Sequence, residues 1–323
     1  MAAVQPAAAR HALASLRHRD FRLLWLGQLI STVGDQMQLI GISWHLYVLT
    51  NSPIQLGLLG VVRAVPFMGL SLAGGAIADA FERKRLLIVT QVSQMAVTTA
   101  LFVTTATGHE AVWQLYAVTF ISGAAQAFDA PARQAMIPNL VPRREMAGAL
   151  TLMTIMRRTS MIVGPGIAGL IIGRFGVAPA YLGNAISFLA VVVAVLLMGP
   201  APKVALAPGN NWDRILGGMR FARREPLVLM PMLMDFLTRG VCNNGTLLPI
   251  FARDVFHAGV QGYGWLSTAA SVGAVAGGLV LGGSRPVKHP IALMLCAYTL
   301  EGLLLAALGL SPVLAVAWIV LFA

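Results

Sequence analysis

Long apolar runs separated by short polar segments make up most of the chain. A transmembrane helix needs about 20 consecutive apolar residues. Runs of that kind lie near residues 23–49, 54–78, 86–106, 111–130, 147–173, 177–199, 227–251, 262–283 and 291–310, and a shorter one begins at 312. The pattern predicts nine complete membrane helices and the start of a tenth. The last run, Pro312–Ala323, is too short to span, so we expect either a fragment or an end that dips into the bilayer.

The connections between these runs are short, except at residues 200–226. That segment is rich in Pro, Gly and Asn and then continues as a short basic amphipathic helix. We therefore predict a cytoplasmic lead at 1–20, a six-helix bundle at 21–199, a cytoplasmic linker at 200–226 and a partial second bundle at 227–323. The lead has no apolar core followed by a cleavage site, so it does not resemble a secretory signal.

Composition and charge exclude a soluble protein. Hydrophobic residues make up 57% of the chain and charged residues 11%, whereas soluble domains carry about a quarter charged residues. Most of the 23 Lys and Arg residues fall in connections that share one side of the membrane, while the outer loops hold Arg174 and Arg253. By the positive-inside rule this pattern predicts a cytoplasmic N-terminus. The net charge of +11 therefore indicates topology, and no nucleic-acid partner is expected.

The stretch AGGAIADAFERKRLL, residues 73–87, ends the second predicted helix with small residues and a dense group of charges. Arg83, Lys84 and Arg85 could serve only as a positive-inside anchor. Alternatively, Gly75 lets another helix approach closely, and the Asp79 carboxylate pairs with cations or caps a neighbouring helix N-terminus. On this second interpretation the stretch also forms a gate.

The GxxxD pattern and its basic cluster resemble the signature loop of the major facilitator superfamily, whose fold has two six-helix bundles. The segments FRLLWLGQLISTVGDQMQ, FDAPARQAMIPNLVP and ILGGMRFARREPLVLM are similar to the enterobactin-exporter-like branch. This resemblance implies an all-α transporter of the bacterial inner membrane that exports siderophores or other small hydrophobic compounds. The second bundle is incomplete in this chain, so we expect the chain by itself to be inactive.

Two further segments carry motifs. In the fifth predicted helix, SMIVGPGIAGLIIG combines Pro165, which bends a helix, with Gly164, Gly166 and Gly169, which allow close packing. In the superfamily a similar motif accompanies drug and proton antiporters. At the end of the fourth helix, Asp129 and Arg133 are gate candidates, and we expect Arg133 to join a network with Asp129 or Glu145.

Ionisable residues at membrane depth are costly and are candidates for function. Asp35 lies in the middle of the first predicted helix and is our first choice for proton coupling or for contact with a cationic cargo. The alternative is a packed polar group without a role in transport. Arg63 needs a polar partner, and Asp35 is the nearest candidate. A direct pair would keep Asp35 ionised and weaken the case for coupling.

Other polar residues complete the predicted cavity. Arg157 and Arg158 are adjacent, about 100° apart on a helix, so at most one faces a cavity, where it could contact an anionic cargo. Asp235 and Arg239 are spaced i,i+4 and could neutralise each other. The stretch that follows contains two adjacent amides that could line the cavity, Asn243 and Asn244.

Enzyme chemistry has no support in the sequence. It has no Walker loop, no Gly-x-Ser-x-Gly elbow and no cluster of His and Cys, so we expect no cofactor or metal. Cys242 and Cys296 lie in apolar runs, where cysteine behaves as a small hydrophobe. We expect a monomeric, proton-coupled exporter whose partners are a small-molecule cargo, protons and membrane lipids. An importer and a non-transporting scaffold or sensor are the alternatives.

Overall fold

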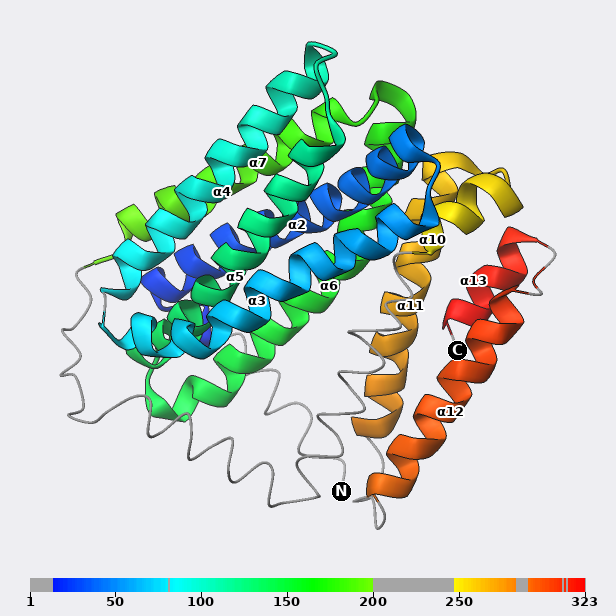
Figure 1. Cartoon of the computed structure of the whole chain (residues 1–323). Coiled ribbons are helices and arrows are strands. Elements are labelled where there is room, and N and C mark those ends of the chain that lie inside the picture. Colours follow the sequence, from blue (N-terminus) through cyan, green and yellow to red (C-terminus); the bar gives the residue numbers. More distant parts are fainter. Residues whose placement is uncertain are drawn as a thin grey trace.

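The computed structural model describes residues 14–80, 82–199, 247–282, 290–309, 311 and 313–322. The first six long helices form one bundle (Figure 1) and match the first six predicted runs within a few residues, except that α5 continues about ten residues past the predicted end at 130. Their bounds are α2 Arg19–Thr50, α3 Pro53–Ala80, α4 Arg83–Ala106, α5 Val112–Leu140, α6 Met146–Phe175 and α7 Ala178–Leu197, with a short 3₁₀ turn, η1 Arg143–Glu145, before α6. We call α2 to α7 the first bundle.

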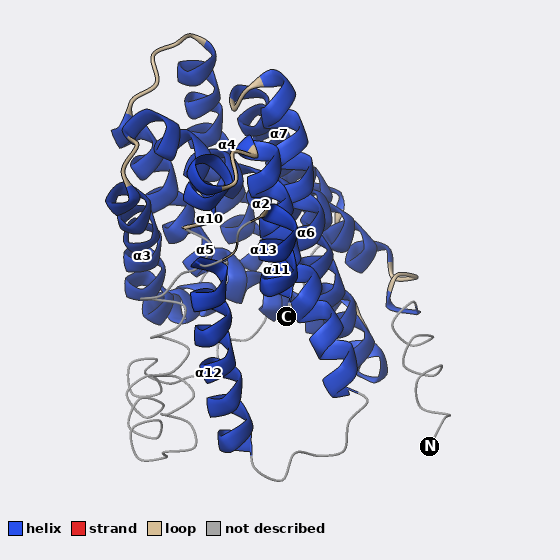
Figure 2. Cartoon of the chain, turned by 90° about the vertical axis from the view of Figure 1, so that its right-hand side faces the viewer, coloured by secondary structure: helices blue, strands red, loops and turns tan. Residues whose placement is uncertain are grey.

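The second group of helices lies beside the end of the first bundle and along α6. It consists of α10 Leu248–Ile250, the π-helical turn η4 Phe251–Val255, α11 Gly259–Gly282, α12 Pro290–Gly309 and α13 Leu314–Phe322. Figure 2 shows helices and loops throughout the described part of the chain. The all-helical fold is therefore confirmed. The predicted linker at 200–226 and most of the run at 227–251 lie outside the described residues.

A stripe of small residues sets the centre of the first bundle. Gly27, Gly34 and Gly41 recur every seventh residue on one face of α2. A β-carbon at these positions would lie 3.0 Å from the Ala194 Cβ, 2.3 Å from the Ser187 hydroxyl and 3.1 Å from the Tyr181 ring, in that order. The glycines therefore let α2 and α7 pack with their backbones close together. The two helices run antiparallel, because rising positions on α2 meet falling positions on α7.

The outside of the molecule is apolar, as a lipid-facing surface requires. Ile54, Trp113 and Phe175 are 82%, 67% and 71% exposed. Within the described residues three helices are long and apolar enough to cross a membrane by length and composition: Arg83–Ala106, Arg143–Phe175 and Ala178–Leu197. By contrast, α2 and α5 carry buried polar side chains, such as Gln28, Gln38 and Asp129, on their inner faces. These residues interrupt the apolar sequence but face the interior of the bundle, not lipid.

Candidate functional site

A cavity of about 270 Å³ lies between the first bundle and the second group of helices. Helices α2, α3, α5 and α6 form one side, and Leu248, α11 and Leu321 of α13 form the other. Much of the lining is apolar, and the polar groups include Asp35, Arg63, Ser122, Gln126, Tyr263 and Ser267. An apolar pocket with a few convergent polar groups is typical of small-molecule sites.

The structure brings Asp35 and Arg63 into this one cavity, from α2 and α3. Both side chains are partly exposed, and they are close enough for their charges to interact. The ion pairs among the described residues do not include Asp35 with Arg63; instead, Arg63 Nη2 donates to Gln126 Oε1 at 3.3 Å. The direct pair considered from the sequence is therefore not formed, and both groups face the cavity.

A buried amide network holds the part of α2 that carries Asp35. Gln38 Oε1 accepts two hydrogen bonds, from Asn184 Nδ2 at 2.7 Å and from the Thr98 hydroxyl at 2.9 Å. Asn184 is also within hydrogen-bonding reach of the Asp35 side chain, and its Oδ1 accepts from the Ser187 hydroxyl at 2.8 Å. We did not single out Asn184 and Thr98 from the sequence. Their signal is an amide and a hydroxyl within otherwise apolar runs.

A second polar group lies toward the other end of the first bundle. The Asp129 carboxylate is 2.7 Å from Arg133 Nη2 and accepts from Gln91 Nε2 at 3.0 Å. Arg133 also donates to Gln28 Oε1. Of the two partners expected for Arg133, Asp129 is the one that it contacts in the structure. The other, Glu145, accepts instead from His18 Nε2 at 2.9 Å when that ring is protonated there.

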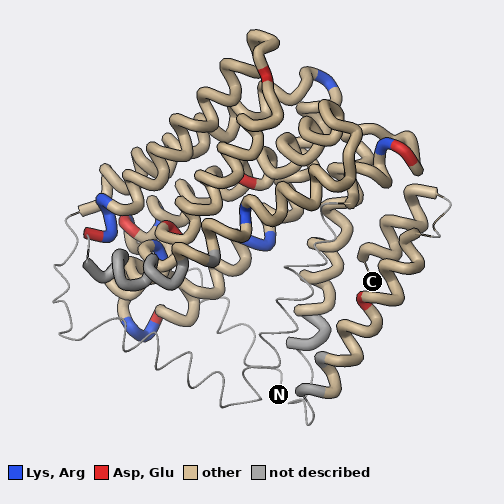
Figure 3. The backbone as a smooth tube through the Cα atoms, viewed as in Figure 1, with Lys and Arg blue, Asp and Glu red and all other residues tan. Residues whose placement is uncertain are grey.

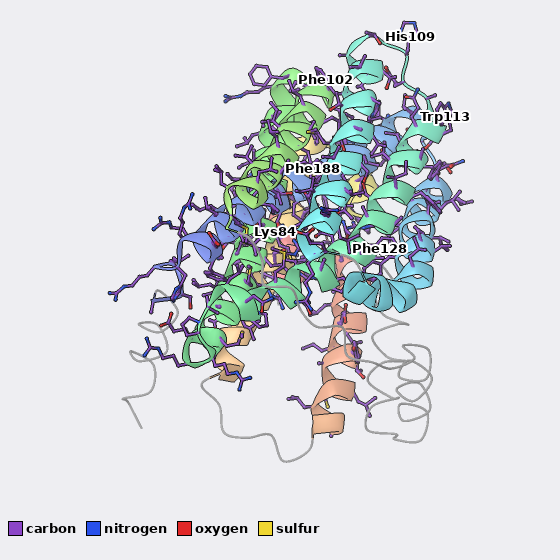
Figure 4. The ribbon with its side chains drawn as sticks, turned by 90° about the vertical axis from the view of Figure 1, so that its left-hand side faces the viewer. Lys84, Phe102, His109, Trp113, Phe128 and Phe188 are labelled. Atoms are coloured by element: carbon purple, nitrogen blue, oxygen red, sulfur yellow. The ribbon has the colours of Figure 1, made fainter. Side chains whose placement is uncertain are left out.

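Two of the basic residues at the start of α4 donate to backbone carbonyls of other helices or helix ends in the first bundle. Arg83 Nη1 donates to the Ala135 carbonyl at 2.6 Å, and Lys84 Nζ donates to the carbonyls of Met198, at 3.0 Å, and Gly199. Lysine near exposed carbonyls at a helix C-terminus is favoured by the helix dipole. Arg85 is exposed and pairs with Glu82 at 2.8 Å. Figure 4 shows Lys84 at the opposite end of the bundle from His109.

Arg83 and Lys84 thus have partners within the first bundle, and their role as a positive-inside anchor stays a prediction. Gly75 and Asp79 belong to α3, but the contacts of these two positions lie outside what the structure describes. Whether they form a gate stays a prediction.

The Gly-Pro motif of α6 lies at the contact between the two groups of helices. Pro165 lines the cavity. A β-carbon at Gly164 would lie 2.4 Å from Gln36 Cβ of α2, and one at Gly169 would lie 3.1 Å from the Val260 carbonyl oxygen of α11. Gly166 is less constrained, because its nearest such neighbour would be 3.8 Å away. The motif therefore permits close packing on both sides of the cavity.

Contacts at the far end of α2 join the first bundle to the second group. The Tyr47 hydroxyl donates to an Asp254 carboxylate oxygen, and Arg253 Nη1 donates to Asn51 Oδ1 at 2.7 Å. The Arg253 guanidinium also lies 5.4 Å from the centre of the Tyr47 ring. The sequence pattern identifies Arg253 only as a base in an outer loop. The partners are about 200 residues apart, so only the fold reveals the contact.

The remaining candidates either do not line the cavity or lie outside the described residues. Arg157 and Arg158 are both exposed on α6, and neither lines the cavity. The candidates Asp235, Arg239, Asn243 and Asn244 all lie in the part of the chain that the structure does not describe.

Comparisons with known proteins agree with this geometry. The family model described as "Transmembrane secretion effector" matches residues 10–323. The staphyloferrin A transporter of Staphylococcus aureus is 27% identical over 258 residues, which cover 77% of this chain and 63% of that protein. The enterobactin exporter EntS of Shigella boydii is 28% identical over 301 residues, which cover 91% of this chain and 71% of that protein. The MFS-type transporter YfiS of Bacillus subtilis is 25% identical, and the match covers 82% of this chain and 64% of that protein.

The match to the staphyloferrin A transporter and to YfiS thus spans less than two thirds of their lengths. Among solved structures, a bacterial homologue of the human lysosomal transporter Spinster, crystallised in an inward-facing and unoccupied conformation, superposes with a TM-score of 0.69. Its identity is 15%, and the match covers 94% of this chain and 72% of that one. This likeness supports the fold.

The family and its relatives are transporters, not enzymes, and their fold is a multi-pass helical membrane fold. The helices described here have this same fold. The chain belongs to the transmembrane secretion effector family of the major facilitator superfamily.

Proposed function

We propose that the protein is a secondary active transporter that exports a small hydrophobic compound or a siderophore, driven by protons. The observation that carries this proposal is the cavity between the two groups of helices, which holds Asp35 and Arg63 without a direct ion pair between them. Charged groups at membrane depth are costly, and a scaffold would have no use for them. In a carrier they bind cargo or protons.

The class of cargo rests on the relatives. Two of them are named as an enterobactin exporter and a staphyloferrin A transporter, so siderophores and compounds of similar polarity are the first cargos to test. The mixed lining suits such molecules, because apolar walls bury a hydrophobic body while Arg63, Ser122 and Gln126 offer hydrogen bonds.

Asp35 is the residue that we assign to proton coupling. A carboxylate in a closed cavity gains or loses a proton as its exposure to water and to other charges changes. Asp129, in the same bundle, contacts Arg133 and Gln91 and does not line the cavity. We further propose that the transporter is a monomer in the bacterial inner membrane with its N-terminus in the cytoplasm, and that it works by alternating access.

The test is gradient-driven efflux from vesicles that contain the full-length transporter. Enterobactin, staphyloferrin A and hydrophobic fluorescent dyes serve as cargos, and the wild type is compared with Asp35→Asn. We expect Asp35→Asn to abolish gradient-driven efflux while cargo exchange without a gradient continues. Asp20→Asn is the matched control, because Asp20 lies on the same helix but contacts the Gly199 backbone amide, at 3.2 Å.

Unchanged efflux by Asp35→Asn would rule out Asp35 as the coupling site. Uptake instead of efflux under the imposed pH gradient would make the protein an importer. If vesicles with and without the protein behave alike for every cargo, the scaffold interpretation replaces transport.

A further inference from the structure

The outer end of α2 meets the second group of helices in two layers of side chains. The first layer is polar and consists of Tyr47 and Asn51 on one side and of Arg253 and Asp254 on the other. The second layer is aromatic and consists of Trp44 and Tyr263. Figure 1 shows α10, which leads into η4, beside the end of α2.

Each of the four residues in the polar layer makes a hydrogen bond across the contact. Tyr47 donates its hydroxyl to Asp254, and Arg253 Nη1 donates to Asn51 Oδ1 at 2.7 Å. Arg253 also reaches the Tyr47 carbonyl oxygen at 3.5 Å and lies over the Tyr47 ring. Asn51 ends α2 in the left-handed conformation, φ 49°, which asparagine tolerates better than most residues.

The η4 side of this layer is accessible to water although Tyr47 is only 3% exposed, so the contacts of Arg253 and Asp254 can break and reform. The side chains of Arg253 and Asp254 are 35% and 49% exposed. Both belong to the π-helical turn η4, and such turns occur frequently at functional sites. A permanent structural contact would gain more from burial, whereas a contact that opens in every cycle must be solvated readily.

The aromatic layer lies one helical turn deeper and touches the cavity. The rings of Trp44 and Tyr263 are stacked, with centroids 6.4 Å apart and an interplanar angle of 21°. Tyr263 is 2% exposed, and its hydroxyl is within hydrogen-bonding reach of Ser43. Both Ser43 and Tyr263 line the cavity. Tyr263 is thus a wall of the cargo cavity and a member of the contact between the two groups.

We propose that the two layers form the outer gate of the transporter, with Tyr263 as the residue that links the cargo cavity to the gate. The gate closes the cavity on the outer side while both layers are formed. Cargo leaves outward when Trp44 separates from Tyr263, and Tyr47 and Asn51 separate from the η4 turn. This inference rests on the proposed alternating-access function but not on proton coupling or on the identity of the cargo.

The test measures the distance across the outer end. Spin labels are attached at His109→Cys, in the first bundle, and Val313→Cys, next to α13, in a full-length background without Cys242 and Cys296. Both label positions are exposed. Double electron–electron resonance then gives the populations of closed and open outer ends without any cargo. Tyr47→Phe removes one hydroxyl and keeps the ring, so folding is preserved.

We expect Tyr47→Phe and Asp254→Asn each to raise the population of the longer distance about threefold to tenfold, the effect of one lost hydrogen bond. Tyr263→Leu, which removes the stack, should act in the same direction. The matched control is Tyr116→Phe: its hydroxyl also lies toward the outer end, but it donates to Gln55 within the first bundle. This control should leave the distribution unchanged.

Distance distributions of Tyr47→Phe and Asp254→Asn that match the wild type would overturn the gate. So would a shift of equal size in Tyr116→Phe, because the effect would then not be specific to the contact between the groups. The distance measurement needs neither a proton gradient nor the Asp35→Asn variant. A failure of proton coupling and a failure of the gate are therefore distinguishable.

Discussion

The two acid–base sets inside the first bundle differ in how many direct contacts their charged groups make. Asp129 is 3% exposed, and its carboxylate contacts both Arg133 and Gln91. Asp35 and Arg63 interact across the cavity but do not pair directly. On the proposed function, the Asp129 carboxylate stabilises the bundle, whereas Asp35 at the cavity is available for proton coupling. Sequence spacing alone did not separate these two roles.

Arg133→Leu should destabilise the protein by about 3 kcal/mol, because it leaves the buried Asp129 carboxylate without its counter-charge. Thermal unfolding in detergent measures the change. The double variant Asp129→Asn/Arg133→Leu should recover much of the loss, since the unpaired charge is gone. Arg85→Leu is the control: its pair with Glu82 is exposed, so no measurable change is expected. Equal stability of Arg133→Leu and Arg85→Leu would contradict the structural role of the buried pair.

At the scale of helices, small residues decide which elements meet. The stripe of Gly27, Gly34 and Gly41 brings α2 against α7, and Gly169 brings α6 against α11. A β-carbon at Gly264 on α11 would in turn lie 2.6 Å from the Pro165 carbonyl oxygen. The α6–α11 contact beside the cavity is therefore a close approach of two backbones.

Gly169→Leu should weaken the packing of α6 on α11 by about 1–3 kcal/mol, the usual cost of overpacking. The reason is that the new side chain would extend past the Val260 carbonyl and the Gly264 Cα, already 3.1 and 3.3 Å from a β-carbon. Gly57→Leu on α3 is the matched control, because a β-carbon there meets nothing within 4 Å. Chemical unfolding of both variants decides the point. Equal tolerance of the two substitutions would refute close packing at Gly169.

The helices themselves could be predicted from the sequence, since bilayer thickness fixes the length of an apolar run. The runs at 54–78 and 86–106 became α3 and α4 within a few residues of their expected ends. Partner choice could not be predicted, because it depends on packing between distant segments. Tyr47 and Asp254 illustrate this limit: each is unremarkable in its own run, and their contact joins residues 207 positions apart.

The whole molecule has two chemically different ends. Arg83, Lys84 and Arg85 lie at one end of the first bundle with Arg143 and Arg144, and Figure 3 shows this grouping of basic residues. The opposite end carries the α4–α5 connection with His109 (Figure 4). The polar layer of the proposed gate lies beside the end of α2. The asymmetry agrees with the positive-inside pattern of the sequence. The division into 1–20, 21–199, 200–226 and 227–323 stays a prediction.

The orientation of the chain decides which way the proposed gate opens, and it can be measured directly. Single cysteines at His109 and Arg85, in a background without Cys242 and Cys296, are treated with a membrane-impermeant maleimide in intact spheroplasts. We expect His109→Cys to react from outside and Arg85→Cys to react only after permeabilisation, because basic loops are retained in the cytoplasm. The reverse labelling pattern would mean that the chain has the opposite orientation in the membrane. The layer of Tyr47 and Asp254 would then close the cytoplasmic side, and the same opening motion would admit cargo instead of releasing it.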